Sequence, residues 1–178
     1  MANCKLTSSI TRDCEYNIAG LRRLYLFNYD AAVSYSASTD GVITAITLPT
    51  NEKIYKMEFA DASASFTDAL TTGSNNNKYR VPTVSFILNG LELDVLNQSD
   101  ALSLGTFVAI AVDKNGKVTL IGSDNGLNAT TDDYASGAAD GDANGWTVTL
   151  VGSENSLIKK VESEDIFKSQ VDIITVTP

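Results

Sequence analysis

The chain has 178 residues, of which 43% are hydrophobic and 20% charged, an ordinary globular composition. The 13 basic and 22 acidic residues give a net charge of −9, and the densest basic groups are only Arg22-Arg23 and Lys159-Lys160. Because phosphate contacts need clustered Lys or Arg, this excludes a surface for sequence-specific nucleic-acid binding. The chain has no histidine, which excludes a Ser-His-Asp triad, a His-ligated zinc and a histidine pH switch.

The first twenty residues are polar, and we expect them to form an N-terminal arm (1–20) ahead of one β-rich domain (21–178). Cys4 and Cys14 fit neither a Cys-x-x-Cys redox motif nor a complete zinc site. The start lacks the apolar region of a secretory signal, so we expect assembly in a cytoplasm with reduced thiols. No run approaches about 18 apolar residues, so we expect no membrane contact.

Apolar and β-branched residues at period two, or in short runs between turn residues, predict most of the chain as strands. Residues 30–40 read as a loop or a weak edge strand. In Asp113-Lys-Asn-Gly116, the pair Asn115-Gly116 supplies the positive φ angles of a tight hairpin turn. The expected strands are 21–29, 42–46, 53–59, 63–70, 79–88, 108–112, 117–121, 145–152 and 171–177.

Three other segments complete the expected fold. Residues 71–78, Thr-Thr-Gly-Ser-Asn-Asn-Asn-Lys, predict a flexible loop, and Pro82 predicts an edge or a bulge because proline lacks a ladder donor. Near-helical spacing of Leu91, Val95 and Leu102 predicts one helix at about 90–104. Residues 156–167 read as a short helix or a polar strand. The expected fold is mainly β, an antiparallel β-sandwich or barrel with one flanking α-helix.

The residues indicate little reactive chemistry. Asp140, Asp142 and Asn144 match the start of a calcium loop, but position twelve is Val151 and a strand follows, so we interpret the segment as a polar turn. Neighbouring acids at 132–133 and 162–165 read as solvated turns. We therefore expect no catalytic residue, no metal and no cofactor.

Two blocks of the chain resemble virion structural proteins of tailed bacteriophages, including crAss-like phages. The N-terminal block has a Cys-x-Leu-Thr opening, a second Asp-Cys and a Gly before the first strand. The distal block combines a hairpin, a Gly-Leu pair, a Gly-rich loop and a Gly-x-Glu. The segments that carry the resemblance are 4–7, 12–14, 18–21, 24–26, 116–122, 125–127, 136–142 and 145–154.

The resemblance implies a non-enzymatic protein of tail-tube or tail-ring type, located in the virion. Its partners would be copies of itself in a ring and other tail, portal or capsid proteins. DNA would pass through a channel whose negative wall repels phosphates. The candidate channel-facing carboxylates are Glu52, Glu58 and Asp61. The candidate contacts with a neighbouring subunit are Cys4, Leu6, Asn75, Asn76 and Asn77.

Three alternatives stay open on the sequence. The first is an auxiliary protein that decorates the capsid. The second is a calcium-dependent carbohydrate-binding module that uses the 140–144 turn with Trp146. The third is an enzyme that works with a carboxylate pair.

Overall fold

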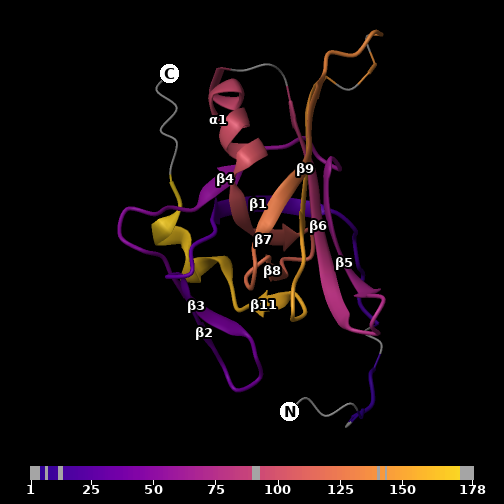
Figure 1. The fold of residues 1–178 in the computed structure, drawn as a ribbon, viewed down its shortest axis with the longest axis vertical. Coiled ribbons are helices and arrows are strands. Elements are labelled where there is room, and N and C mark those ends of the chain that lie inside the picture. Colours follow the sequence, from indigo (N-terminus) through magenta and orange to yellow (C-terminus); the bar gives the residue numbers. More distant parts are fainter. Residues whose placement is uncertain are drawn as a thin grey trace.

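The computed structural model describes residues 5–6, 8–11, 14–89, 93–139, 141–142 and 144–172 (Figure 1). The described residues are mainly in strands, with one α-helix, so the prediction of a mainly β protein with one helix is confirmed. The strands are β1 (Leu21–Asn28), β2 (Ser34–Ala37), β3 (Ile43–Thr47), β4 (Tyr55–Met57), β5 (Ala64–Thr72), β6 (Lys78–Asn89), β7 (Thr106–Asp113), β8 (Val118–Ile121), β9 (Leu127–Ala135), β10 (Gly145–Gly152) and β11 (Lys159–Val161). The helices are α1 (Leu93–Leu104) and two 3₁₀ turns, η1 (Glu164–Ile166) and η2 (Lys168–Gln170).

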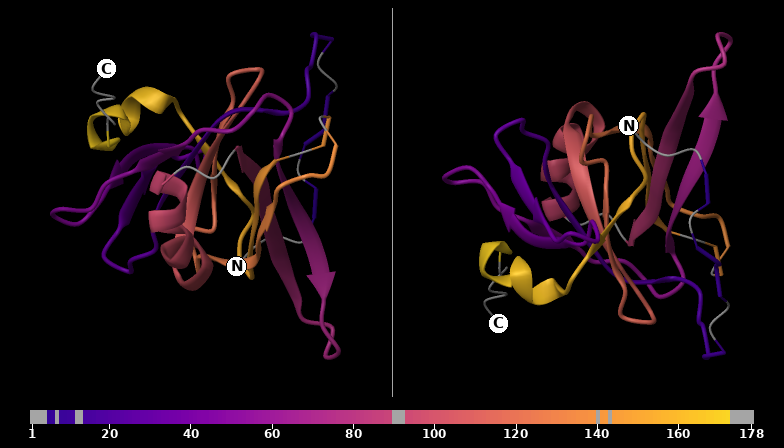
Figure 2. Two further views of the ribbon diagram at one scale, coloured as in Figure 1. Left: turned by 90° about the horizontal axis from the view of Figure 1, so that it is seen from above. Right: turned by 90° about the horizontal axis from the view of Figure 1, so that it is seen from below.

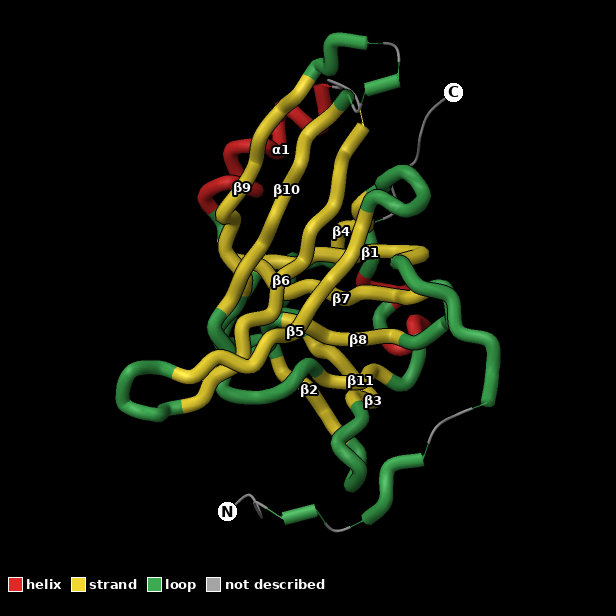
Figure 3. Tube along the Cα trace, turned by 90° about the vertical axis from the view of Figure 1, so that its right-hand side faces the viewer, coloured by secondary structure: helices red, strands yellow, loops and turns green. Residues whose placement is uncertain are grey.

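The strands follow the order β2-β3-β11-β8-β7-β9-β10-β6-β5, and β1 pairs with both β7 and β4. Apart from the parallel pair β3–β11, the strand pairs are antiparallel. The sheet bends where β7 meets β9, because only Thr106 and Phe107 pair there. Figure 3 shows the result, in which β9, β10, β6 and β5 cross over the layer that contains β1, β7 and β8. These strands form a sandwich and do not close into a barrel.

The central strands β1 and β7 are buried on both faces. Leu24 and Leu26 of β1 belong to the core between the two layers, whereas Tyr25 and Phe27 belong to a second core on the opposite face. Phe167, after η1, is fully buried in that second core. Double burial explains why β1 carries a continuous apolar run where a strand with one wet face would alternate.

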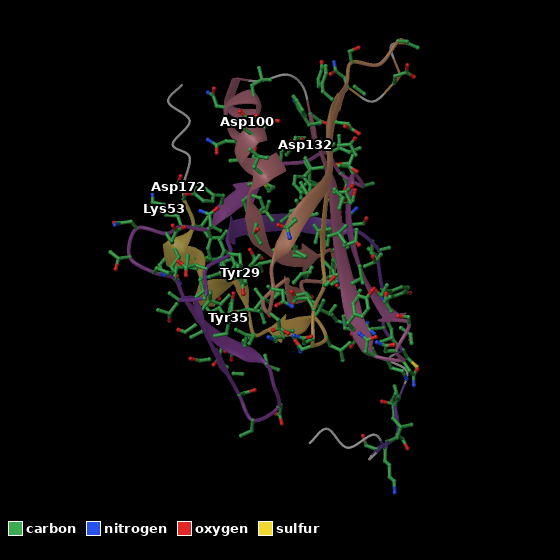
Figure 4. All side chains as sticks on the ribbon, in the orientation of Figure 1. Tyr29, Tyr35, Lys53, Asp100, Asp132 and Asp172 are labelled. Carbon is green, nitrogen blue, oxygen red and sulfur yellow. The ribbon has the colours of Figure 1, made fainter. Side chains whose placement is uncertain are left out.

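Helix α1 packs against β9. Leu102 reaches the core between the layers, and Asp132 on β9 (Figure 4) accepts hydrogen bonds from Ser99 at 3.2 Å and from Ser103 at 2.5 Å. Asp132 and Asp133 both lie in the strand β9. The expectation of a turn at 132–133 is therefore wrong, and Asp132 gains its partners only when the helix folds against β9, whereas Asp133 is exposed.

Two turns bear on the predictions. In the β7–β8 hairpin only Gly116 has a positive φ, 80°, while the Asp113 side chain accepts the N–H groups of Asn115 and Lys117. Asn115 therefore does not take the left-handed conformation that we expected of it. Pro82 lies inside β6, opposite Asp68 of β5, and β6 is flanked by β5 and β10, so the expectation of an edge or a bulge is wrong. The β6–β10 ladder only lapses there, between the pair Thr83–Val151 and the bridge from Arg80 to Glu154, without a change of register.

The strand boundaries differ from the predictions in several places. The polar segment 127–135, which we did not expect to be a strand, is β9, and the weak edge at 30–40 contains β2. The strand expected at 53–59 shortens to β4. Of the strand expected at 171–177, Val171 forms a parallel bridge to Ile54, and residues 173–177 lie outside the described part of the chain.

Candidate functional site

The residues that resemble a calcium loop are used to hold their own turn. Asp142 accepts the backbone N–H groups of Ala139 at 2.8 Å and Ala138 at 2.9 Å, and these bonds lower the pKa of Asp142. The Asn144 side chain accepts the hydroxyl of Tyr134 at 3.2 Å. Asp140 lies outside the described residues, among which no three His, Cys, Asp or Glu side chains form a group that could hold a metal.

The three carboxylates predicted to face a channel flank β4 and do not lie within a strand. Glu52 precedes β4 and Glu58 follows it, with Asp61 in the next turn. Glu58 pairs with Lys56 at 2.8 Å and Asp61 pairs with Lys114 at 2.7 Å. Each lysine lowers the pKa of its carboxylate, first by the hydrogen bond and then by its charge. Two of the three negative charges are thus locally compensated.

The residues predicted to contact a neighbour lie at two separate places. Asn75, Asn76 and Asn77 are exposed in the turn of the β5–β6 hairpin, which projects from the body of the molecule in Figure 2. A hydrogen bond from the Gly73 N–H to the Asn77 carbonyl, 2.8 Å, closes this turn. Leu6 lies in the N-terminal segment, and Cys4 lies outside the described residues.

The N-terminal segment exposes large apolar side chains. The exposed fractions are 88% for Leu6, 90% for Ile10, 103% for Tyr16 and 60% for Ile18. In the described part of the segment, the hydrogen bonds to the rest of the chain lie at its end, where Asn115 accepts the Ile18 N–H at 3.1 Å and donates to the Ile18 carbonyl at 3.0 Å. Figure 3 shows the segment running outside the two strand layers. Solitary exposed hydrophobic residues are common, but a series of them on one segment indicates an interaction site.

The most buried carboxylate, Glu154, holds the turn between β8 and β9. Glu154 is 4% exposed, and its two oxygens accept the backbone N–H groups of Asp124 at 2.8 Å and Asn125 at 2.9 Å. The turn needs glycine at two positions, because Gly122 and Gly126 both have a φ of 81°. The Asn-Gly-Leu and Gly-x-Glu motifs are therefore two halves of one structural contact.

A polar cluster surrounds the same turn. Asp124 accepts hydrogen bonds from Lys159 at 2.8 Å and Ser156 at 2.5 Å, and Lys159 also donates to Ser123 at 2.8 Å. Burial acts to raise the pKa of Asp124, but the bonds from Lys159 and Ser156 outweigh burial and lower it. A serine can act as a nucleophile when a neutral amine beside it takes up its proton. Lys159 is instead ion-paired with Asp124, so its contact with Ser123 does not form such a pair.

A second polar cluster joins the C-terminal part of the chain to β1. Arg23 donates to both oxygens of Glu164, at 2.6 and 2.7 Å, and Tyr25 donates to the same carboxylate at 3.0 Å. Glu164 is therefore not a solvated turn residue, contrary to our expectation for 162–165, whereas Glu162 and Asp165 are exposed. Beside the cluster is a shallow open hollow of about 190 Å³, lined by Arg22, Arg23, Lys56, Met57, Glu58 and Phe59. Most of its charged groups already have ionic partners.

Comparisons of the chain with protein-family models, with curated proteins and with solved structures found no match. No helix in the described part of the chain is long and apolar enough to span a bilayer.

Tyr25 is expected to titrate late. Burial, and then the hydrogen bond to Glu164, raise the pKa of Tyr25 to about 12. An unfolded tyrosine titrates near ~10, so between these values only the folded state keeps the proton, and the free energy of unfolding falls as the pH rises from about 10 to about 12.

Ultraviolet titration of the folded protein measures this effect. Burial also raises the pKa of Tyr35, so the control is Tyr25→Phe, which should remove one late-titrating group and leave another. An unchanged high-pH titration curve in Tyr25→Phe would contradict the assignment.

Proposed function

We propose that this protein is a non-enzymatic structural protein of a bacteriophage virion that self-assembles into a ring or tube of the tail or of the head–tail connection. The observation that carries the proposal is the N-terminal segment, in which Leu6, Ile10 and Tyr16 are at least 88% exposed. Leaving such side chains in water forgoes roughly 1.5–3 kcal/mol for each Leu or Ile that a partner would bury.

The architecture also supports an assembly role. Among the described residues, the edge strands β2 and β5 pair on one side only, and a free strand edge is a template for pairing with another chain. A contact between an arm and a different surface of the next copy is heterologous, and such contacts generate rings or open tubes.

Several residues that carry the phage resemblance have structural roles, as the proposal of a structural protein expects. Glu154, Gly122 and Gly126 shape the β8–β9 turn, and Gly145 starts β10 against the backbone of β6. None of them surrounds a deep cleft. Under this proposal the net charge of −9 keeps DNA from adhering to the assembled channel.

Multi-angle light scattering on the purified full chain tests the proposal. We expect multimers whose fraction grows with concentration, and closed rings or tubes in negative-stain electron micrographs. Copies that bind singly to capsomers would support the decoration alternative instead. A monomer up to the highest soluble concentration would contradict self-assembly.

A further inference from the structure

Strand β5 is a free edge whose outward backbone groups can be identified. Arg80 on β6 directs its N–H and carbonyl to Glu154, away from β5, and Gly73 bonds Asn77 at the hairpin end. Along an antiparallel ladder, hydrogen-bonded pairs alternate with pairs whose backbone groups point away from each other. Arg80 turns away from its partner Leu70, and Gly73 turns toward Asn77. The backbone N–H and carbonyl groups of the even-numbered residues of β5 therefore point outward. Among the described residues no backbone partner faces Phe66 or Leu70, while the Asp68 carbonyl accepts a bond from the Arg80 side chain at 2.8 Å.

This edge has only one of the usual protections against pairing. Exposed edge strands commonly carry lysine, proline or an inward-pointing charge. The nine residues of β5 contain neither lysine nor proline. Their one charged side chain, Asp68, is 6% exposed and is neutralised by Arg80 at 3.0 Å. Asp68 is thus the one inward-pointing charge on β5, and Arg80 neutralises it and also occupies its carbonyl. The outward backbone groups of Phe66 and Leu70 are therefore the ones open to pairing with another segment.

An apolar surface accompanies the edge on the side of the core. Even-numbered side chains of β5 face the core side, where Ala64 and Phe66 pack, and Leu70 continues this row with 58% of its surface exposed. The Ile158 N–H approaches the Asp68 carboxylate at 3.4 Å, which places the adjoining Leu157, 63% exposed, beside this end of β5. A strand added at the edge could cover both leucines.

The N-terminal segment has the pattern of the missing strand. Leu6, Ile10, Tyr16 and Ile18 all occupy even positions, so an extended chain places them on one face. Because the fastening begins at Asn17 and Ile18, the eleven residues from Leu6 to Tyr16 would span up to ~36 Å when extended. That reach is long enough for a neighbouring copy.

We propose that the N-terminal segment of one copy adds as a strand to the β5 edge of a second copy and sets its apolar face against Leu70 and Leu157. This inference rests on the proposed self-assembly and specifies its contact. It also explains why the arm is apolar on one face only.

Matched charge substitutions on the full-length chain test both sides of the contact. Leu6→Glu with Ile10→Glu should weaken self-association by roughly 30-fold or more, since two buried aliphatic side chains are replaced by charges. Ser9→Glu with Thr11→Glu places the same charges on the opposite face and should change association by less than about threefold. On β5, Leu70→Lys should weaken association, and Thr67→Lys, on the outer face, should not.

Photo-cross-linking identifies the occupant. A photoreactive phenylalanine analogue at position 70, in an equal mixture of ¹⁵N-labelled and unlabelled protein, should give cross-links of mixed isotope composition to residues 5–11. Links to β5 of another copy, links of unmixed composition or the absence of links to the arm would overturn the inference. Multimers that persist without arm links would leave the proposed function standing, whereas a strictly monomeric wild type would refute both.

Discussion

Replacing Glu154 with alanine is expected to lower the free energy of unfolding by about 2–4 kcal/mol, because two backbone N–H groups lose their acceptor in a buried place. Those groups belong to Asp124 and Asn125, and the glutamate that binds them is 4% exposed. Urea denaturation followed by circular dichroism measures the change.

Two further variants sharpen the Glu154 test. Glu154→Gln keeps one carbonyl acceptor and should cost less than Glu154→Ala. Glu162→Ala removes an exposed carboxylate and should stay within about 0.5 kcal/mol of the wild type. If Glu154→Ala unfolds at the same urea concentration as Glu162→Ala, the carboxylate does not hold the turn.

Replacing Gly145 with alanine is expected to cost about 3 kcal/mol or more, through backbone strain and a clash inside the sheet. Gly145 has a φ of 156°, and an added Cβ would lie 2.2 Å from the carbonyl oxygen of Leu88. Since Gly145 pairs with Asn89 on one side and Ala135 on the other, relieving the clash disturbs two ladders.

Gly141→Ala is the matched control for Gly145→Ala, because no atom lies within 4 Å of a Cβ at position 141. Thermal unfolding of the two variants should separate them clearly, with Gly141→Ala close to the wild type. Equal stability of both variants would show that the start of β10 tolerates a side chain.

Periodicity predicted the strands whose burial is simple. β10 alternates because one face packs on the core, and the β7–β8 hairpin is marked by its turn residues. The sequence did not predict β9, because after Leu127 its side chains are exposed or only partly buried and its polar sequence resembles a loop. What holds β9 in place is pairing with β10 and contact with α1, neither of which a local pattern contains.

The candidate sites were harder to predict than the fold. The resemblance included Asn125 and Glu154, but only folding brings residues some 30 positions apart into one turn. The N-terminal arm could be predicted as a segment from its polar composition. The strand pairing proposed for it depends on the edge of β5, which sequence order does not reveal, because β5 lies at the end of a layer that begins with β9.

Because β1 and β7 are buried on both faces, the stable centre of the fold is separate from the surfaces proposed to contact other copies. The hydrophobic cores on both faces hold these strands within their own chain, whereas the edge strand β5 and the turn of the β5–β6 hairpin lie at the periphery. In the proposed assembly, each polypeptide would therefore make its contacts with other copies without disturbing its own buried centre.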